Sequence, residues 1–388
     1  MRVLISTVPA HGHLLPLIPI ARAAERAGHD VVIASGVEGV AEARRRGFTT
    51  WDVGPSRAEQ DAAFRARVPD LAAIPADVRM STVISEMFGA AALRRAEALV
   101  PRAEAWQPDL VIHPVTELAG AAAAARCGAR HAVHGLGPLP AMSWTWFGAR
   151  ISELGARWDL PTLAHDILAV PYLDNCPAAL QTDAVDAFRI RWPIRPTSGE
   201  VLPGERLPWD DAMLRALPHE RTVHLTLGTI FHGLTEVFEA ALAGLGQLPV
   251  NVLVAVGPGR DVDQLGPQPP HVLVTDFAPH ALLLPRCDAL VTQGGAGTIV
   301  AALCHGVPHL ILPQGADQFA NATTAERAGV ALQLLPQAAT PDAIADAVAR
   351  LLEDRSIART ADRVANVIGS MPSADEVLTG LLEIHAAA

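Results

Sequence analysis

The chain has 388 residues, half of which are hydrophobic, and it carries a formal net charge of −11. This length allows two domains, each with its own core, and the acidic balance offers no basic surface for nucleic acid. No apolar run is long enough to span a membrane, and the first residues form a predicted strand rather than a signal peptide, so we expect a cytoplasmic globular protein without stable membrane insertion.

The N-terminal half predicts alternating strands and helices. Residues 2–7 and 30–34 are predicted strands, joined by a loop over 8–13 and a helix over 15–27. A short helix over 41–46 and a third strand over 49–53 are expected next. Their continuous apolar runs are typical of a parallel sheet covered by helices on both faces. Residues 55–78 show poor periodicity and predict an irregular excursion that forms part of a substrate wall.

A long amphipathic helix is predicted over residues 80–106, interrupted at Pro101. The elements expected after it are a strand at 108–113, a helix at 117–127, a strand at 129–134 and a helix at 149–158. Large apolar side chains cluster between the last two, at Met142, Trp144, Trp146 and Phe147. The cluster is either ordinary core or a wall for a large apolar acceptor, and the sequence leaves both readings open.

Prolines and glycines without periodicity over residues 191–209 indicate a domain boundary. We therefore expect an N-terminal domain over 1–195, a linker over 196–210, a C-terminal domain over 211–370 and a last helix within 371–388 that could pack back on the N-terminal domain. The C-terminal domain again predicts alternating elements. These are strands at 222–227, 250–256, 272–275, 289–292 and 309–312, and helices at 234–245, 281–284, 298–304, 325–328, 341–353 and 356–369.

An anion site is predicted where the strand over 289–292 ends. Gly294, Gly295 and Gly297 follow it immediately before a helix. Unpaired backbone N–H groups at the positive end of a helix attract phosphate, and glycine leaves room for close approach. The next strand delivers Gln314, Asp317, Gln318 and Asn321 beyond its carboxyl end, where open α/β sheets bind ligands. A phosphate site followed by polar side chains suggests a nucleotide sugar.

Several motifs occur together in a fixed order: Thr226-Leu-Gly-Thr229, Phe277-Ala-Pro-His280, Gln293-Gly-Gly-Ala-Gly-Thr298 and Pro313-Gln-Gly-Ala-Asp-Gln-Phe-Ala-Asn-Ala322. They resemble the donor-site signature of GT-B inverting glycosyltransferases, in particular the actinobacterial enzymes that decorate antibiotics and other natural products. Gly12-His13 and Glu117-Leu-Ala-Gly120 extend the likeness to nearly the whole chain. The resemblance implies an α/β fold of two Rossmann-like domains facing across a cleft.

The resemblance also implies an activity. It is the metal-independent transfer of a sugar or deoxysugar from a TDP- or UDP-sugar to a small apolar acceptor such as a polyketide or antibiotic aglycone. The nucleotide sugar is a co-substrate, and no separate cofactor is expected. The family's donor-site roles fall on Gly228, Thr229, Phe277, Pro279, His280, Gln293, Gly294, Gly295, Ala296, Gly297, Thr298, Asp317 and Gln318.

His13 is the expected catalytic base, because it follows the first strand and a neutral imidazole titrates near the working pH. His11 could also reach the site; a His-x-His metal pair is disfavoured because no third ligand lies nearby. Many relatives place an acidic residue after the strand that ends at His113, whereas this chain has Pro114. Glu117 is either its substitute or a first-turn helix carboxylate.

A second departure is Gln293, where relatives usually have a histidine that contacts the diphosphate. An amide can donate a hydrogen bond but carries no charge. This departure and Pro114 leave open a non-catalytic sugar-nucleotide-binding protein, and a sugar-nucleotide epimerase is a third alternative. The sequence does not identify the acceptor, the sugar or the linkage, and it leaves open whether the protein forms a homodimer.

Overall fold

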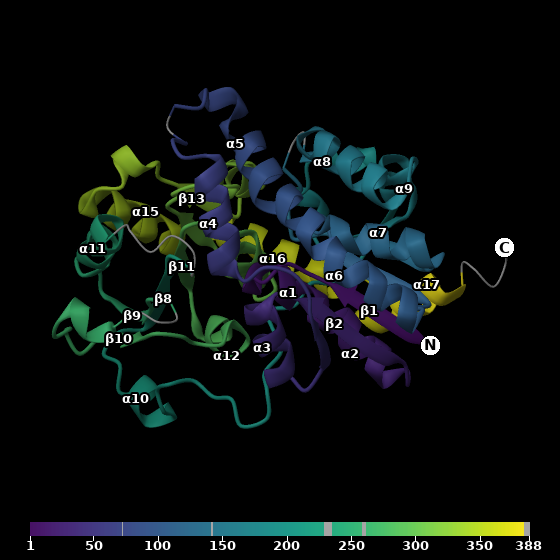
Figure 1. Ribbon diagram of the computed structural model, residues 1–388. Coiled ribbons are helices and arrows are strands. Elements are labelled where there is room, and N and C mark those ends of the chain that lie inside the picture. Colours follow the sequence, from purple (N-terminus) through teal and green to yellow (C-terminus); the bar gives the residue numbers. More distant parts are fainter. Residues whose placement is uncertain (72, 141–142, 229–234, 258–260, 384–388) are drawn as a thin grey trace. The chain divides into compact units, whose positions relative to one another are not determined.

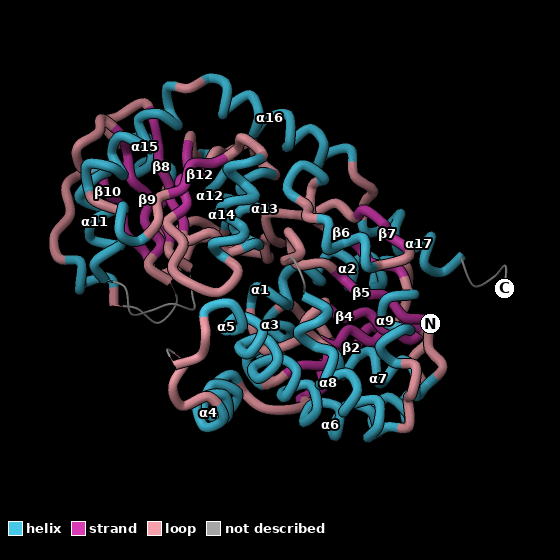
Figure 2. The backbone as a smooth tube through the Cα atoms, turned by 90° about the horizontal axis from the view of Figure 1, so that it is seen from above, coloured by secondary structure: helices cyan, strands magenta, loops and turns pink. Residues whose placement is uncertain are grey.

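The computed structural model describes residues 1–71, 73–140, 143–228, 235–257 and 261–383, which form two compact units. Unit 1 contains Met1–Cys176, Thr182–Arg195 and the segment that begins at Pro372; unit 2 contains Pro177–Gln181 and Pro196–Met371. Residues 196–210, the expected linker, are thus part of unit 2. Each unit has one parallel sheet with helices around it (Figures 1 and 2), which confirms the predicted pair of parallel α/β sheets.

The sheet of unit 1 has seven strands in the order β3-β2-β1-β4-β5-β6-β7. In chain order they are β1 (Arg2–Ser6), β2 (Asp30–Ser35), β3 (Thr49–Asp52), β4 (Leu110–Pro114), β5 (Arg130–His134), β6 (Pro171–Asp174) and β7 (Ile190–Pro193). The helices are α1 (His11–Leu14), α2 (Ile18–Arg26), α3 (Val37–Arg45), α4 (Arg57–Arg67), α5 (Ala76–Ile84), α6 (Ala90–Trp106), α7 (Leu118–Cys127), α8 (Ser143–Trp158), α9 (Leu163–Ala169) and α17 (Ala374–Glu383).

Successive side chains of these strands pack into two different cores. Leu4 of β1 belongs to a cluster with residues of α6, α7 and α8, whereas Val3 and Ile5 belong to a cluster with residues of α2 and α17. Alternation of this kind follows from the two-residue period of a strand. Because both faces are covered by helices, every position of the strand can be apolar, which explains the continuous apolar runs in the sequence.

The structure corrects three predicted segments of unit 1. The loop over 8–13 contains the one-turn helix α1, so His13 is helical. Residues 55–78 contain all of α4 and the start of α5, and α4 begins with a capping box in which Ser56 and Glu59 bond each other's backbone N–H. The helix expected over 80–106 is not interrupted at Pro101, which lies inside α6. A π-helical turn at Ser85–Gly89 joins α5 to α6.

The sheet of unit 2 has six strands in the order β10-β9-β8-β11-β12-β13. They are β8 (Arg221–Thr226), β9 (Val250–Ala255), β10 (Val272–Thr275), β11 (Ala289–Thr292), β12 (His309–Ile311) and β13 (Ala331–Gln333). The helices are α10 (Asp211–Arg215), α11 (Thr235–Leu245), α12 (His280–Leu283), α13 (Ala296–Leu303), α14 (Gln318–Arg327), α15 (Pro341–Glu353) and α16 (Arg355–Ser370). β6, β7 and β13 have no counterpart among the predicted elements.

Candidate functional site

Both sheets have a point at which the strand order reverses. In unit 1, β1 lies beside β4, and in unit 2, β8 lies beside β11, although the chain runs from β1 to β2 and from β8 to β9 on the opposite side. The strand order therefore reverses at each of these pairs. Such switch points, at the carboxyl ends of the strands, are where open α/β sheets bind ligands.

His13 follows β1 at the switch point of unit 1. Its Nδ1 lies 2.7 Å from Oγ1 of Thr116, which comes just after β4, and its ring centroid lies 5.3 Å from that of Phe88 in the π-helical turn. Burial lowers the pKa of His13 to about 3, and the positive charges of Arg57 and Arg95 act in the same direction. The imidazole is therefore neutral at physiological pH, and the expectation that His13 titrates near the working pH is wrong.

Glu117 contacts different groups. Its carboxylate is fully buried, bonds the guanidinium of the equally buried Arg95, and accepts a hydrogen bond of 2.8 Å from the backbone N–H of Ala119. It therefore caps α7, whereas Thr116 is the residue that contacts His13. His11 is 54 % exposed, with Nε2 4.0 Å from Glu42 Oε2. The sequence analysis did not single out Thr116, because a lone threonine after a strand has no distinctive pattern.

The predicted acceptor wall is described only in part. Met142 lies outside the described residues, and the side chains of Trp144 and Trp146 in α8 are also outside them. Phe147 is 1 % exposed and belongs to the core shared by α6, α7 and α8. For Phe147 the structure supports the core reading.

Gly228 and Gln293 lie next to each other at the switch point of unit 2. Gly228 follows β8 with φ +75°, and a Cβ on it would lie 2.0 Å from Nε2 of Gln293, which directly follows β11. Gln293 is buried, and its Oε1 accepts a hydrogen bond of 2.9 Å from Thr292 Oγ1. The amide of Gln293 thus occupies the space that a side chain at position 228 would need. Thr229 lies outside the described residues.

The glycine loop leads into α13, which begins at Ala296 rather than at the expected residue 298. Gly294 has φ +92°, and a Cβ there would lie 2.6 Å from Ile311 Cγ2. Gly295 is the N-cap residue, and Gly297 lies in the first turn with open space around its Cα. The N–H of Thr298 donates to the carbonyl oxygen of Gly295 at 3.0 Å. The N–H groups of Ala296 and Gly297 come before the first hydrogen bond of the helix ladder, so they can bind an anion.

Asn321 connects this loop to the segment after β12. Its Nδ2 donates to the carbonyl oxygen of Gly294 at 3.0 Å and to Oδ2 of Asp317 at 2.9 Å. Burial raises the pKa of Asp317. Gln318 Oε1 accepts from the backbone N–H of Gln314 at 2.8 Å. The polar side chains expected to hold a sugar therefore also hold the two loops together.

The motif after β10 presents one aromatic ring to solvent. Phe277 is 49 % exposed, and its backbone N–H donates to Asp276 Oδ1 at 2.8 Å. Pro279 is buried and precedes α12, and His280 is the first residue of that helix. Burial, reinforced by His305, lowers the pKa of His280 to about 4, and its ring packs edge-on against His224.

The described part of the chain offers neither a membrane-spanning helix nor a cluster of metal ligands. No helix in it is long and apolar enough to cross a membrane. No group of three or more His, Cys, Asp or Glu side chains in it is placed to hold a metal ion.

The chain is similar to known proteins over its whole length. Residues 22–191 and 239–384 match the N-terminal and C-terminal domains of the family described as erythromycin biosynthesis protein CIII-like. Elloramycin glycosyltransferase ElmGT of Streptomyces olivaceus is 31% identical over 98% of this chain and 97% of its own. L-demethylnoviosyl transferase of Streptomyces niveus is 31% identical over 86% of this chain and 85% of its own.

Solved structures agree with these relatives. Glycosyltransferase VinC in complex with dTDP is 26% identical and superposes with a TM-score of 0.76 over 100% of both chains. Spinosyn rhamnosyltransferase SpnG is 26% identical with a TM-score of 0.80, covering 98% of this chain and 99% of its own. The chain therefore belongs to the erythromycin biosynthesis protein CIII-like family of GT-B glycosyltransferases, which use nucleoside-diphosphate sugars.

Proposed function

We propose that the protein transfers a deoxysugar from a TDP-sugar to a hydroxyl group of a polyketide or similar antibiotic aglycone, with inversion at the anomeric carbon. Relatives named as deoxysugar transferases support this donor class, including aclacinomycin-T 2-deoxy-L-fucose transferase and 10-deoxymethynolide desosaminyltransferase. The dTDP bound to VinC supports thymidine as the nucleoside. The observation that carries the proposal is the pair of switch points, with His13 at one and the open first turn of α13 at the other.

His13 acts as the base in this reaction. Its Nε2 takes the proton of the acceptor hydroxyl while the acceptor oxygen forms a bond to the anomeric carbon. The bond between that carbon and the diphosphate oxygen breaks, and its electron pair leaves with the diphosphate. Attack from the opposite face converts an α-linked donor into a β-linked product. The hydrogen bond between Nδ1 and Thr116 leaves Nε2 free for this role when Nδ1 carries the hydrogen.

The leaving diphosphate binds at the start of α13. The N–H groups of Ala296 and Gly297 and the positive end of the helix dipole stabilise its developing charge. Gln293 adds an amide donor at this place instead of a charged imidazole. Phe277 stacks on the nucleobase. The carboxylate of Asp317 accepts hydrogen bonds from the sugar hydroxyls, and the side-chain NH2 group of Gln318 donates to them.

Replacement of His13 by alanine tests this assignment. Because general base catalysis contributes about 10²- to 10⁴-fold, we expect His13→Ala to reduce kcat by that order. TDP binding, measured by calorimetry, should be unchanged because the variant leaves unit 2 intact. His165→Ala, which removes an exposed histidine of α9, is the matched control. Wild-type turnover by His13→Ala combined with a large loss in His11→Ala would transfer the role to His11.

A further inference from the structure

The partner of the base is a neutral hydroxyl. Among the residues that the structure describes, Thr116 makes the only side-chain hydrogen bond to His13. Phe88, whose ring packs against the imidazole of His13, is also uncharged. A carboxylate in this place would stabilise the imidazolium that forms when the base takes a proton, and it would fix the hydrogen on Nδ1. A hydroxyl has no charge with which to stabilise the imidazolium. Because it can donate or accept a hydrogen bond, it also fixes the hydrogen on Nδ1 only weakly.

The charged groups around His13 do not replace that carboxylate. Arg57 of α4 and Arg95 of α6 are the charges that act on the imidazole, and both disfavour its protonated form. The carboxylates nearest to these arginines are paired with them and not with His13: Arg57 bonds Asp61 at 2.9 Å, and Arg95 bonds Glu117.

Glu42, on the neighbouring α3, is held by two arginines. Arg45 and Arg46 bond its Oε1 at 2.8 Å and 2.9 Å, and these contacts lower the pKa of Glu42 even though burial opposes the shift. The protonated form of His13 therefore lacks a free carboxylate among its described neighbours.

We propose that this arrangement restricts the acceptor: the enzyme glycosylates hydroxyl groups that are already acidic, phenols and enols, and discriminates against aliphatic alcohols. The inference rests on the proposed transfer function and on His13 as its base. Proton transfer is efficient when the acidities of donor and base are matched. A base whose cation is destabilised accepts a proton readily only from an oxygen that releases it easily. The class of acceptor is thus set by Thr116 and the two arginines that act on His13.

The test uses the full-length protein, with TDP-rhamnose or TDP-glucose as donor. The acceptors are 2-naphthol and 2-naphthalenemethanol, which have the same aromatic body and differ in hydroxyl acidity. We expect kcat/KM to favour the phenol by about 100-fold or more, the range that general base catalysis spans. Equal use of both acceptors by the wild type overturns the inference and leaves the transferase function standing. If the protein binds TDP in calorimetry but transfers sugar to neither acceptor, the proposed function itself is contradicted.

Variants at Thr116 separate charge from shape. Thr116→Asp and Thr116→Asn place side chains of nearly the same size beside His13, and only the first is charged. We expect Thr116→Asp to reduce the ratio of kcat/KM for the phenol to kcat/KM for the alcohol by about tenfold or more. Thr116→Asn should leave this ratio unchanged. Thr379→Asp, on the exposed side of α17, controls for the added surface charge.

NMR titration of the His13 ring in the same proteins gives a readout that does not depend on turnover. The pKa of His13 should rise in Thr116→Asp and not in Thr116→Asn. If Thr116→Asp raises this pKa but keeps the full preference for the phenol, the neutral partner does not select the acceptor and the inference is wrong.

Discussion

At the scale of single residues, two glycines of the proposed diphosphate site have different roles. Gly228 is required by the protein itself, because its φ is +75° and a Cβ would overlap Nε2 of Gln293. Gly297 has nothing within 4 Å of its hypothetical Cβ and lies in the first turn of α13. If a diphosphate binds there, the open space at Gly297 is reserved for the ligand and not needed by the fold.

This difference gives a prediction for two alanine variants. Gly297→Ala should retain the free energy of unfolding or raise it by about 0.5–1 kcal/mol, because alanine is the better helix former, but it should weaken TDP binding. Gly228→Ala should lower both the free energy of unfolding and the affinity for TDP, because alanine is strained at this left-handed φ and its Cβ displaces Gln293. Urea unfolding and calorimetry with TDP measure the two quantities. Gly297→Ala that binds TDP as tightly as the wild type would show that the phosphates lie elsewhere.

The sequence predicts the glycine loop of unit 2 better than the surroundings of His13 in unit 1. A strand, three glycines and a helix make a local pattern, so the position of Gly294–Gly297 can be read directly. The contact between Gly228 and Gln293 and the one between His13 and Thr116 depend on which strands become neighbours. Local periodicity does not contain that information. Glu117 is an example, because the sequence allows it to be either the partner of His13 or a carboxylate at the start of a helix. Only its contact with Arg95 in the folded chain decides between the two.

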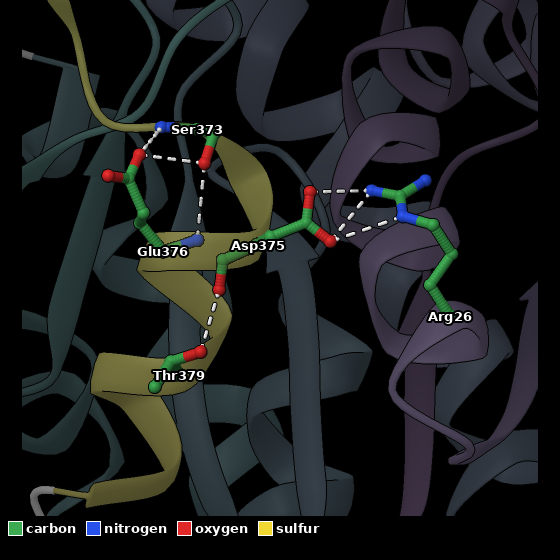
Figure 3. A network of polar contacts seen from close by, with 5 residues as sticks. All are labelled: Arg26, Ser373, Asp375, Glu376 and Thr379. Atoms are coloured by element: carbon green, nitrogen blue, oxygen red, sulfur yellow. Dashed lines mark hydrogen bonds and ion pairs between the residues drawn. The ribbon is translucent and has the colours of Figure 1, made fainter.

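At the scale of elements, α17 shows how a terminal helix is held by its apolar face. Val377, Leu378 and Leu381 are buried in the core that also contains residues of α2 and β1. The ion pair between Arg26 and Asp375 lies at the edge of this contact, with side chains 58% and 57% exposed (Figure 3). Ser373 begins the helix by accepting from the N–H of Glu376, whose carboxylate accepts from Ser373 N–H in return (Figure 3).

The two kinds of contact should contribute differently to stability. Leu378→Ala should reduce the free energy of unfolding by about 2–5 kcal/mol, because it removes a buried side chain and leaves a cavity. Asp375→Ala should cost at most about 1 kcal/mol, because an exposed ion pair is screened by water and salt. Urea unfolding of both variants at low and high salt measures this difference. A larger loss for Asp375→Ala than for Leu378→Ala would mean that the charges, and not the apolar face, hold α17.

Two elements that the sequence analysis missed, α4 and the π-helical turn, have different causes. The helix α4 has a readable start, the capping box of Ser56 and Glu59, but few of its side chains are buried and the apolar periodicity is therefore weak. The π-helical turn at Ser85–Gly89 has no such signal. It places Phe88 against His13 and brings Gly89 so close to Arg150 that a Cβ would lie 2.6 Å from its Cγ. Tertiary packing, not local propensity, accounts for this turn.

At the scale of the whole molecule, both units bury histidines in the neutral form. Burial is the main cause of a lowered pKa at His13, His113, His131, His134, His224, His280 and His309. In the unfolded chain each would titrate near its ordinary value of 6.5. The unfolded state therefore binds more protons than the folded state between that value and the folded pKa, which is about 4 for His309.

The sign of this linkage predicts an acid-labile enzyme. The free energy of unfolding is independent of these groups above pH 6.5 and falls as the pH drops through that value, by about 1.4 kcal/mol per pH unit for each buried histidine. Urea midpoints between pH 7.5 and about 5 measure the slope in a window above the range of ordinary carboxyl groups. His309→Leu removes one such group from the core of β12 and should flatten the slope by that amount, whereas His165→Ala at the surface should not. A slope unchanged in His309→Leu would mean that His309 takes up its proton in the folded state, and that burial in unit 2 does not keep its ring neutral.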